Sequence, residues 1–429
     1  MNVIVVLSRA SRHVAVVAVI TASFLIGAVG AQTFSVASPV RVSRTGEIVA
    51  EFSSATAPNN PQLMAASAIK RISPSQTLCA VYVSRNGGNS WSEVPAWPGG
   101  GLQAIYDPWV AIGPDGTIHA TGIARTNIGS RVAYTQSRDQ GVSWSVARAV
   151  TPLESKFHRR SSDKDCLTVG DDGTIYVAFN QILTSPLGER GLIVARSTDD
   201  GLTWTTRDTK AAGFPNGIVT APGGTVTVTF IGGSVPGYGT VTSTDGGDTW
   251  AAPVSLGALN LSGGLPLPSI VRDSFGRIVI GDIGGATTPQ LEVAIENTDG
   301  TLAQQWQLPL PDSNTCSNGR LIQPVVTDGP NRSPAFQVAC KIDSAESTAG
   351  RMEVWLYPNI DQPSLGPVLV TGFQLPAQPT SHDQFARRFP DGGDYWSFTW
   401  KAQGWLSMLV DPRSGGGPGR LRAAAVTAN

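Results

Sequence analysis

Acidic residues stand at the beginning of several short apolar runs in this sequence, where they could do chemistry. Asp107 precedes a Pro-Trp-Val-Ala run, Asp163 opens an Asp-Lys-Asp cluster, and Asp383 follows His382. Two carboxyl groups that flank a glycosidic bond can cleave it, one of them protonating the leaving group. Asp107, Asp163 and Asp383 are therefore candidate catalytic residues, although each could instead cap a turn, bind Ca²⁺ or hold a structural water.

Side chains that could hold a substrate stand near these acids. They are an aromatic ring, three guanidinium groups and an imidazole, namely Tyr106, Arg159, Arg160, Arg320 and His382. An arginine binds a carboxylate through two parallel hydrogen bonds, so Arg159 and Arg160 could grip an anionic sugar. A basic pair in a loop is more often solvated. We expect the candidates to gather where short strands begin, beside the polar residues Asn216 and Gln323.

The elements that must position these residues are marked by a repeat, Ser-x-Asp/Asn-x-Gly-x-Ser/Thr-Trp, which occurs four times at intervals of about 50 residues. Its fixed positions are Ser84, Asn86, Gly88 and Trp91; Ser137, Asp139, Gly141 and Trp144; Ser197, Asp199, Gly201 and Trp204; and Ser243, Asp245, Gly247 and Trp250. The Asp or Asn side chain accepts hydrogen bonds from backbone N–H groups, and Gly permits a positive φ. The Trp packs beside the strands. Each copy therefore predicts a rigid turn with a structural role.

A second repeat, in phase with the first, consists of a short strand, a tight turn and another strand. Its turns are marked by Asn60, Gly116, Gly173, Gly224, Gly276, Asn331 and Gly392. Together the two repeats give a unit of four strands and about 50 residues, which is typical of a propeller blade. Seven such units predict an all-β, seven-bladed propeller, with six blades as the alternative.

The last unit indicates how the ring closes. It has strand-like segments over 385–388, 395–400 and 405–410 but no fourth strand, whereas a spare strand-like segment, 34–42, precedes the first unit. We expect segment 34–42 to complete the seventh blade, which leaves no free sheet edge. The glycine-rich sequence that follows predicts a flexible tail over 414–429.

The first 31 residues have the composition of a secretory signal peptide. Basic residues precede an uncharged apolar stretch that ends in Val29-Gly30-Ala31, so we expect cleavage before Gln32, with an uncleaved membrane anchor as the alternative. The propeller would then span 32–413 in a secreted or periplasmic protein. No second apolar stretch of about 18 residues follows, so no membrane span is expected in the mature chain.

Charge and cysteines limit the partners and cofactors. The formal net charge is −1 and no basic run occurs, so the sequence lacks the electrostatic footprint of a nucleic-acid partner. Cys316 and Cys340 would lie near the same face of the sixth unit, and we expect a disulfide between them, whereas the pairing of Cys79 with Cys166 stays open. No Cys-x-x-Cys spacing suggests a zinc site. No cofactor is expected to be required, although Ca²⁺ could bind the acids.

The four turn repeats resemble the Asp boxes, or bacterial neuraminidase repeats, of the sialidase superfamily, and the blade layout extends this resemblance over the mature chain. The resemblance implies a propeller with its site at the channel mouth, away from the Asp boxes. Sialidases of this superfamily bind the substrate carboxylate with three arginines, use a Tyr nucleophile paired with a Glu, and carry an Arg-Ile-Pro motif near the first blade. The nearest match here, Val40-Arg41-Val42-Ser43, lacks the proline, and no arginine or tyrosine set stands out by its spacing.

Three functions remain open. A monomeric, non-catalytic propeller could bind extracellular glycans or a surface protein, an exo-sialidase-type glycoside hydrolase could release terminal sialic acids, and a structural propeller could serve assembly. An arginine triad facing a Tyr–Glu pair would favour hydrolysis, whereas a mouth with only Asp, Asn and Gln would favour binding. The missing motifs favour binding, and fold by itself does not determine function.

Overall fold

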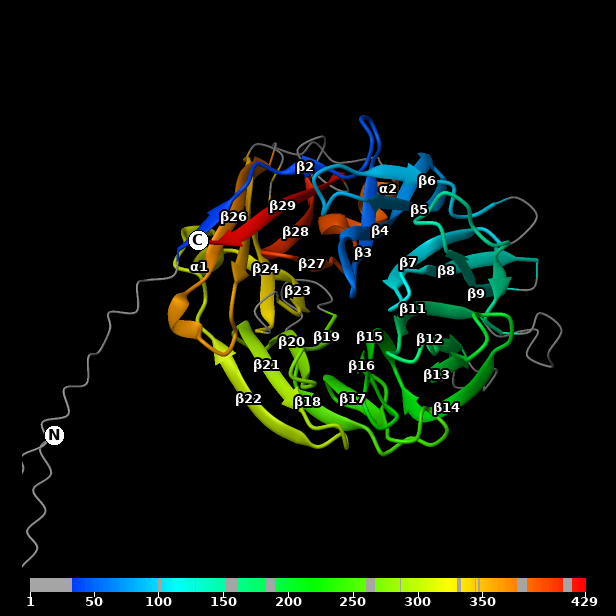
Figure 1. Ribbon diagram of the computed structural model, residues 1–429. Helices are drawn as coiled ribbons and strands as arrows, with labels where there is room; N and C mark the ends of the chain where they lie inside the picture. Colours follow the sequence, from blue (N-terminus) through cyan, green and yellow to red (C-terminus); the bar gives the residue numbers. More distant parts are fainter. Residues whose placement is uncertain are drawn as a thin grey trace, which may run out of the picture. The chain divides into compact units, whose positions relative to one another are not determined.

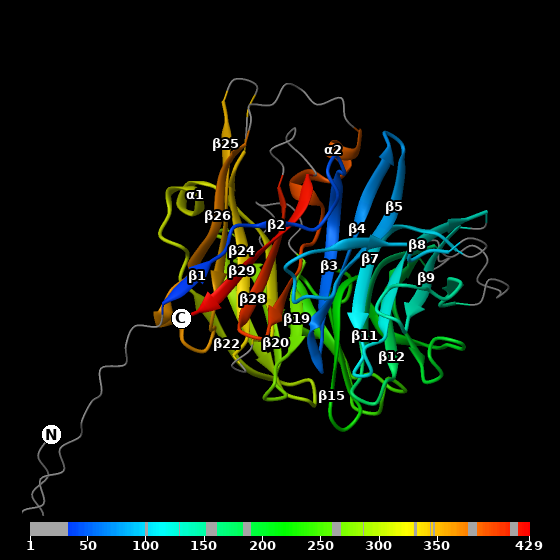
Figure 2. The same ribbon diagram turned by 45° about the horizontal axis from the view of Figure 1, so that its top comes forward.

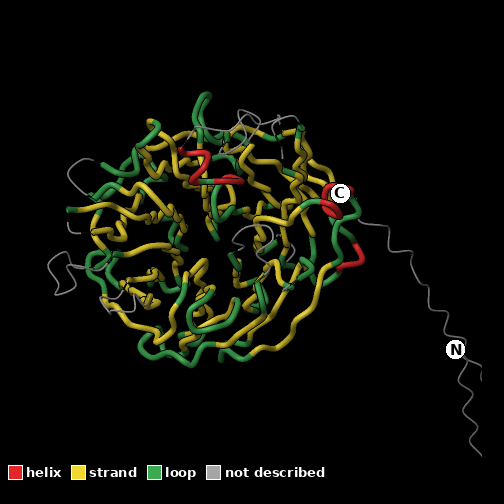
Figure 3. Tube along the Cα trace, turned by 180° about the vertical axis from the view of Figure 1, so that it is seen from behind, coloured by secondary structure: helices red, strands yellow, loops and turns green. Residues whose placement is uncertain are grey.

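The computed structural model describes residues 33–98, 102–127, 129–151, 161–182, 190–259, 267–285, 287–329, 333–343, 345, 348–375, 384–411 and 419–429. Within these residues strands predominate, and they form seven antiparallel sheets. Figure 1 shows the sheets arranged radially around a common centre, and Figure 3 shows the same ring from behind, with few helical segments. The fold is an all-β, seven-bladed propeller, as the repeats predicted.

The first six blades each contain four strands that are consecutive in the sequence and ordered from the centre outward. Blades one to three comprise β3 (Val49–Ala57), β4 (Asn60–Ser73), β5 (Gln76–Ser84) and β6 (Ser92–Val94); β7 (Ala104–Ile112), β8 (Ile118–Thr126), β9 (Gly129–Ser137) and β10 (Arg148–Ala149); and β11 (Ser162–Val169), β12 (Ile175–Ile182), β13 (Arg190–Ser197) and β14 (Thr205–Ala212). Blades four to six comprise β15 (Phe214–Ala221), β16 (Thr225–Ile231), β17 (Tyr238–Ser243) and β18 (Val254–Gly257); β19 (Ser269–Arg272), β20 (Ile278–Gly284), β21 (Gln290–Glu296) and β22 (Leu302–Leu308); and β23 (Arg320–Thr327), β24 (Ala335–Ile342), β25 (Gly350–Tyr357) and β26 (Val368–Leu375).

Helix α1 (Asn314–Asn318) precedes β23, and the 3-10 helix η2 (Pro363–Leu365) lies between β25 and β26. Helix α2 (Gln384–Arg388) and the 3-10 helix η3 (Pro390–Gly392) lead into blade seven. Among the residues that the structure describes, no helix is long and apolar enough to cross a membrane.

Blade seven joins the two ends of the propeller. It contains β27 (Phe398–Lys401), β28 (Gly404–Asp411) and β29 (Arg420–Ala428). The N-terminal strands β1 (Phe34–Val36) and β2 (Val40–Arg41) pair antiparallel with β29. The N-terminal segment therefore supplies the outermost strands of the last blade and closes the ring, as predicted.

Other expectations for this blade are wrong. Arg420–Ala428 form strand β29 and not a flexible tail, because its side chains, Leu421 and Val426 among them, are buried in the largest apolar cluster. Segment 385–388 belongs to helix α2, where Phe385 and Phe389 are spaced to pack on one side. Gly392 lies in η3, and the hairpin turn falls between β27 and β28.

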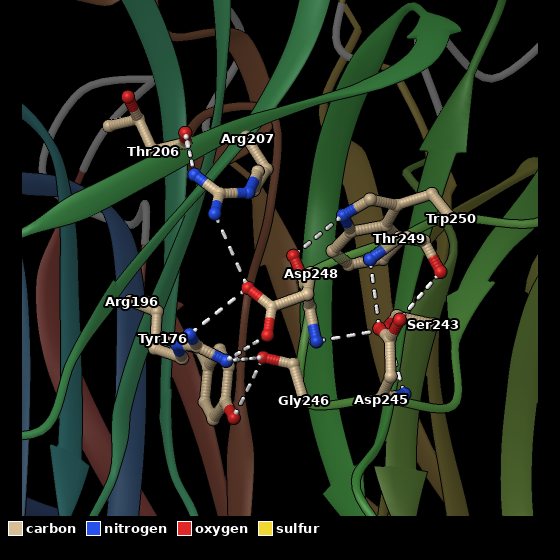
Figure 4. Close-up of polar contacts among 11 residues, drawn as sticks. Tyr176, Arg196, Thr206, Arg207, Ser243, Asp245, Gly246, Asp248, Thr249 and Trp250 are labelled. Carbon is tan, nitrogen blue, oxygen red and sulfur yellow. Dashed lines mark hydrogen bonds and ion pairs between the residues drawn. The ribbon is translucent and has the colours of Figure 1, made fainter.

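The four Asp boxes form the turns between the third and fourth strands of blades one to four. In the fourth box, which Figure 4 shows, Asp245 accepts hydrogen bonds from Thr249 N (2.8 Å), Thr249 Oγ1 (2.6 Å) and Ser243 Oγ (2.8 Å). The Trp250 indole N–H donates to Gly247 O at 3.2 Å. The hydrogen bonds from Thr249 and Ser243 lower the pKa of Asp245 to about 2. The box is therefore a satisfied hydrogen-bonded turn, as expected.

Blades one, two and three each contact the Asp box of the next blade. The Arg85 guanidinium donates to Gln140 O, Gln136 Nε2 to Asp200 O (3.1 Å), and Arg196 Nη1 to Gly246 O (2.7 Å). These carbonyls belong to the same position of boxes two, three and four, the one before the box glycine. Arg196 and Arg207 of blade three also contact the Asp248 carboxylate (Figure 4).

The cysteines behave in two ways. Cys316 in α1 and Cys340 in β24 form a disulfide, as predicted. Cys79 and Cys166 are buried and unpaired, and the Cys79 thiol donates to Tyr106 O at 3.3 Å. Disulfides form in oxidising compartments, so the Cys316–Cys340 bond is consistent with a location outside the cytoplasm.

Candidate functional site

Five of the innermost strands contain a β-bulge at the same position, close to where the strand begins. The bulged residues, which we call the bulge ring, are Glu51, Asp107, Lys164, Asn216 and Gln323. A bulge re-aims a side chain that the regular strand would direct between blades. All five strands run in the same direction, so the ring lies at one face of the propeller, which we call the mouth. The Asp boxes follow the third strands, which also end away from the mouth, at the base face.

Four members of the bulge ring have a positive φ without being glycine: 39° at Glu51, 48° at Asp107 and Lys164, and 58° at Gln323. Such a conformation costs on the order of 1–3 kcal/mol for each residue and persists only where the surroundings impose it. Strained residues of this kind gather at ligand-binding and catalytic sites. The backbone thus points to the mouth as the candidate site.

Lys164 joins carboxylates of three other blades. Its Nζ lies 2.7 Å from Asp394 Oδ2, 3.2 Å from Asp107 Oδ1 and 3.6 Å from Glu51 Oε1. The side chains of Glu51, Asp107 and Lys164 are at most 12% exposed, whereas that of Asp394 is 39% exposed. The network therefore presents one carboxylate, that of Asp394, to a ligand.

Burial controls protonation in this network. Desolvation raises the pKa of Glu51 to about 8, the charge of Lys164 opposes the shift, and Asp107 and Asp394 reinforce it. Burial by itself would lower the pKa of Lys164, but the three carboxylates raise it well above its ordinary value. At neutral pH the site therefore combines a neutral Glu51 with a charged Lys164.

The other ring members tie blades together. Asn216 Nδ2 donates to Pro268 O at 3.2 Å, and Gln323 Nε2 donates to Gly393 O at 2.7 Å. Glu51 Oε1 accepts the backbone N–H of Asp394 at 3.2 Å. The ring thus fixes the geometry of the mouth as well as lining it.

The carboxyl group of Asp165 and the hydroxyl group of Tyr395 are buried away from solvent. Both carboxylate oxygens of Asp165 are buried without a hydrogen-bond partner, and burial raises the pKa of Asp165 well above its usual value. Burial likewise raises the pKa of Tyr395, whose hydroxyl donates to Pro108 O at 3.2 Å. A neutral, enclosed tyrosine of this kind is not poised as a nucleophile.

The rim of the mouth carries two further groups that the sequence singled out. The Tyr106 ring lies under the guanidinium group of Arg388. Arg320 Nε lies 2.6 Å from Asp343 Oδ2, and Arg320 Nη2 lies 2.6 Å from Asp391 Oδ2. Lys341 contacts the same two carboxylates. Arg320 is therefore part of an ion network and not a free anion ligand.

The remaining predicted residues fall in two groups. Asp163 is half-buried on β11, opposite Asn180, and it is its neighbour Lys164 that occupies the ring position. Asp383, His382, Arg159 and Arg160 lie outside the residues that the structure describes. Of the three candidate acids, the structure therefore brings Asp107 alone into the described network.

Four residues at the mouth are not among the candidates that the sequence suggested: Glu51, Asp394, Arg125 and Arg388. Glu51 interrupts the apolar sequence Val49-Ala50-Glu51-Phe52, and a charge in such a run could have indicated a special role. Asp394 and Arg388 carry no comparable signal, because only the ring closure and helix α2 bring them to the mouth, and Arg125 is a single exposed charge near the end of β8.

A cavity of 590 Å³ occupies the channel between the innermost segments of all seven blades. Trp109, Asn216 and Trp400 line it, together with hydroxyl groups such as that of Thr168. In the described part of the chain, no group of three or more His, Cys, Asp or Glu side chains is arranged to hold a metal ion. The acids at the mouth contact the amine of Lys164.

Solved structures with the same fold have low sequence identity to this chain. A protein of unknown function from Dyadobacter fermentans matches with a TM-score of 0.51 and 14% identity, over 92% of this chain and 99% of that chain. A structure of NanB with Optactamide matches with a TM-score of 0.50 and 13% identity, over 71% of this chain and 67% of that chain. NanB is a sialidase of Streptococcus pneumoniae. No protein family and no curated protein matches the sequence.

At these identities the likeness establishes architecture alone: the chain has a sialidase-like β-propeller fold. The chemistry has to come from the site itself. The mouth offers a carboxylate acceptor, a buried neutral acid, amide groups and an ammonium group in a strained, interlocked ring, which can exchange hydrogen bonds with a polar ligand.

Proposed function

We propose that the protein is an exported propeller that binds a carbohydrate at the bulge ring. The observation that carries the proposal is the repeated strained bulge, which aims Glu51, Asp107, Lys164, Asn216 and Gln323 at one mouth. Sugar hydroxyls both donate and accept hydrogen bonds, so they suit a site that mixes acceptors with donors. Asp394, the exposed member of the network, is the group that would accept from a sugar hydroxyl.

Two features favour binding over sialidase-type hydrolysis. Arg320 is engaged by Asp343 and Asp391, and so it is not available to grip a substrate carboxylate. The Tyr395 hydroxyl is buried against a backbone carbonyl. The disulfide and the signal-like N-terminal sequence support export, because disulfides persist in oxidising compartments.

The test is a glycan array probed with the purified protein that begins at Gln32, followed by calorimetry on the best glycans. Asp394→Asn should weaken binding by about tenfold or more, because it removes a charged acceptor from the site. Asp208→Asn, on the outer strand β14 beside Lys210, is the matched control and should bind as the wild type does. Absence of glycan binding by the folded protein, or equal affinity of the Asp394 variant, would refute the proposal.

Hydrolysis of a glycosidic bond is the second candidate function, and the raised pKa of Glu51 favours it. A protonated carboxylic acid close to a carboxylate is the pair that glycosidases use. Glu51 is only 3% exposed, which keeps it from a sugar bound at the mouth unless the network opens. Turnover of a fluorogenic sialic-acid glycoside that is lost in folded Glu51→Gln would establish hydrolysis, and no turnover across a range of pH would exclude sialidase action.

A further inference from the structure

Two arginines converge on one aromatic ring at the rim of the mouth. The Cζ atom of Arg388 lies 4.0 Å from the centroid of the Tyr106 ring, and Arg388 Nη1 donates to the Tyr106 hydroxyl at 2.9 Å. The Cζ atom of Arg125 lies 5.5 Å from the same centroid. Tyr106 directly precedes Asp107 of the bulge ring, so this group borders the proposed sugar site.

Regular elements hold the backbone of both arginines in place. Arg388 is the last residue of α2, which Figure 2 shows beside the upper ends of β3 and β4. Phe385 and Phe389 anchor this helix, because they pack with Ala50, Ile69 and Tyr106 in one apolar cluster. Arg125 lies near the end of β8, where its backbone pairs with Ser130 of β9. The backbone of both arginines therefore needs little further ordering when a ligand arrives.

No carboxylate of the described residues contacts either of these two arginines. Lys164, Arg320 and Lys341 each contact at least two carboxylates. Among the described residues, by contrast, neither Arg125 nor Arg388 contacts a carboxylate, and both are exposed. Two like charges near one ring repel each other, and an anion that contacts both would offset that repulsion. The rim therefore presents two guanidinium groups that an anion could contact.

The arrangement favours an anion with three terminal oxygens. One guanidinium fork can satisfy both oxygens of a carboxylate, whereas a sulfate ester has three oxygens to distribute between two guanidinium groups. We propose that Arg125 and Arg388 form a subsite for the sulfate ester of a glycan, whose sugar ring contacts the bulge ring. This inference rests on the proposed carbohydrate-binding function and adds the class of carbohydrate.

The experiment uses an array of matched glycans, in which each sulfated sugar stands beside its uronic acid and its neutral counterpart, with calorimetry on the best set. The wild type should bind the sulfated member about tenfold or more tightly than the neutral one, and the preference should shrink in high salt. Arg388→Gln and Arg125→Gln should each remove most of this preference. Arg207→Gln, on blade three, is the matched control.

The outcomes separate the two proposals. If neutral and sulfated glycans bind equally, or if both rim variants keep the preference, the anion subsite is refuted while carbohydrate binding stands. If carboxylated glycans bind as tightly as sulfated ones, the assignment to sulfate is refuted. If no glycan binds, the proposed function fails and the subsite fails with it. Should Arg388→Gln unfold, Arg125→Gln decides, because Arg125 makes no described hydrogen bond to helix α2.

Discussion

Residues with positive φ lie at both faces of this propeller, but their surroundings differ. At the base, the Asp boxes place glycine, as at Gly201 (74°), and also Gln140 and Asp200 at positive φ, and they satisfy the turn with uncharged hydroxyl groups around one exposed acid. At the mouth, the bulge ring places Glu51, Asp107 and Lys164 at positive φ and buries these ionisable groups together. The acid of a box at the base is exposed and satisfied by hydrogen bonds, whereas the mouth combines positive φ with buried ionisable groups, which is typical of a functional site.

The largest effect is expected at the base, from Gly201→Ala. A Cβ atom there would lie 2.2 Å from the buried ring of Tyr134, at a φ that side chains disfavour. We expect a loss of about 4 kcal/mol in the free energy of unfolding, from overpacking and backbone strain together. The control is Gly116→Ala, which has a similar φ of 84° but open space, and which should cost about 1 kcal/mol. Chemical denaturation measures both, and equal losses would contradict the packing role of the box glycine.

Lys164→Met tests the mouth in the same way. It removes the cation that contacts the carboxylates of Asp107 and Asp394 and the neutral Glu51, so we expect a loss of roughly 3 kcal/mol at pH 7. Adding Asp107→Asn to the variant should restore part of this stability, since fewer buried charges would then lack a partner. A Lys164 variant as stable as the wild type would mean that water already screens the network.

Glu51→Gln tests whether a buried acid at the mouth makes the stability of the protein depend on pH. Because the folded-state pKa of Glu51 is raised to about 8, its contribution to stability is fully present below the unfolded pKa and is lost as pH rises toward 8. Glutamine does not titrate, so the variant should not show this pH dependence. Between pH 5 and pH 8, the free energy of unfolding of the wild type should fall by on the order of 2–3 kcal/mol relative to that of the variant. Denaturation curves at three pH values test this. A difference that is independent of pH would show that Glu51 is ionised in the folded protein.

The smallest effect is expected from Arg196→Met at the base. Arg196 links blade three to Gly246 O and Asp248, but its side chain is 27% exposed and that of Asp248 is 47% exposed (Figure 4). Such a contact contributes about 0.5 kcal/mol. High salt screens the ion pair between Arg196 and Asp248, so the part of the shift in the denaturation midpoint that comes from this pair should disappear in high salt. A loss of several kcal/mol would mean that the clamps between blades, and not the boxes, carry the stability of the base.

Local sequence determined much of the fold. The Asp boxes, the blade period, the closure by segment 34–42 and the Cys316–Cys340 bond are visible in the chain, because each depends on turn chemistry or on spacing within a repeat. The last blade was the exception. The glycine-rich run before Gly419 concealed strand β29, and a helix that is anchored by Phe385 and Phe389 resembled a strand over four residues.

Some features of the mouth could be predicted from the sequence, and others depend on the tertiary structure. The chain alone placed Asp107, Asn216 and Gln323 at strand beginnings, because a polar residue that precedes an apolar run is a local signal. Only the closed ring decided that Lys164 of blade three meets Asp394 of blade seven, and that Arg388 covers Tyr106. These contacts join residues more than 200 positions apart, and their energies depend on burial that no local pattern records.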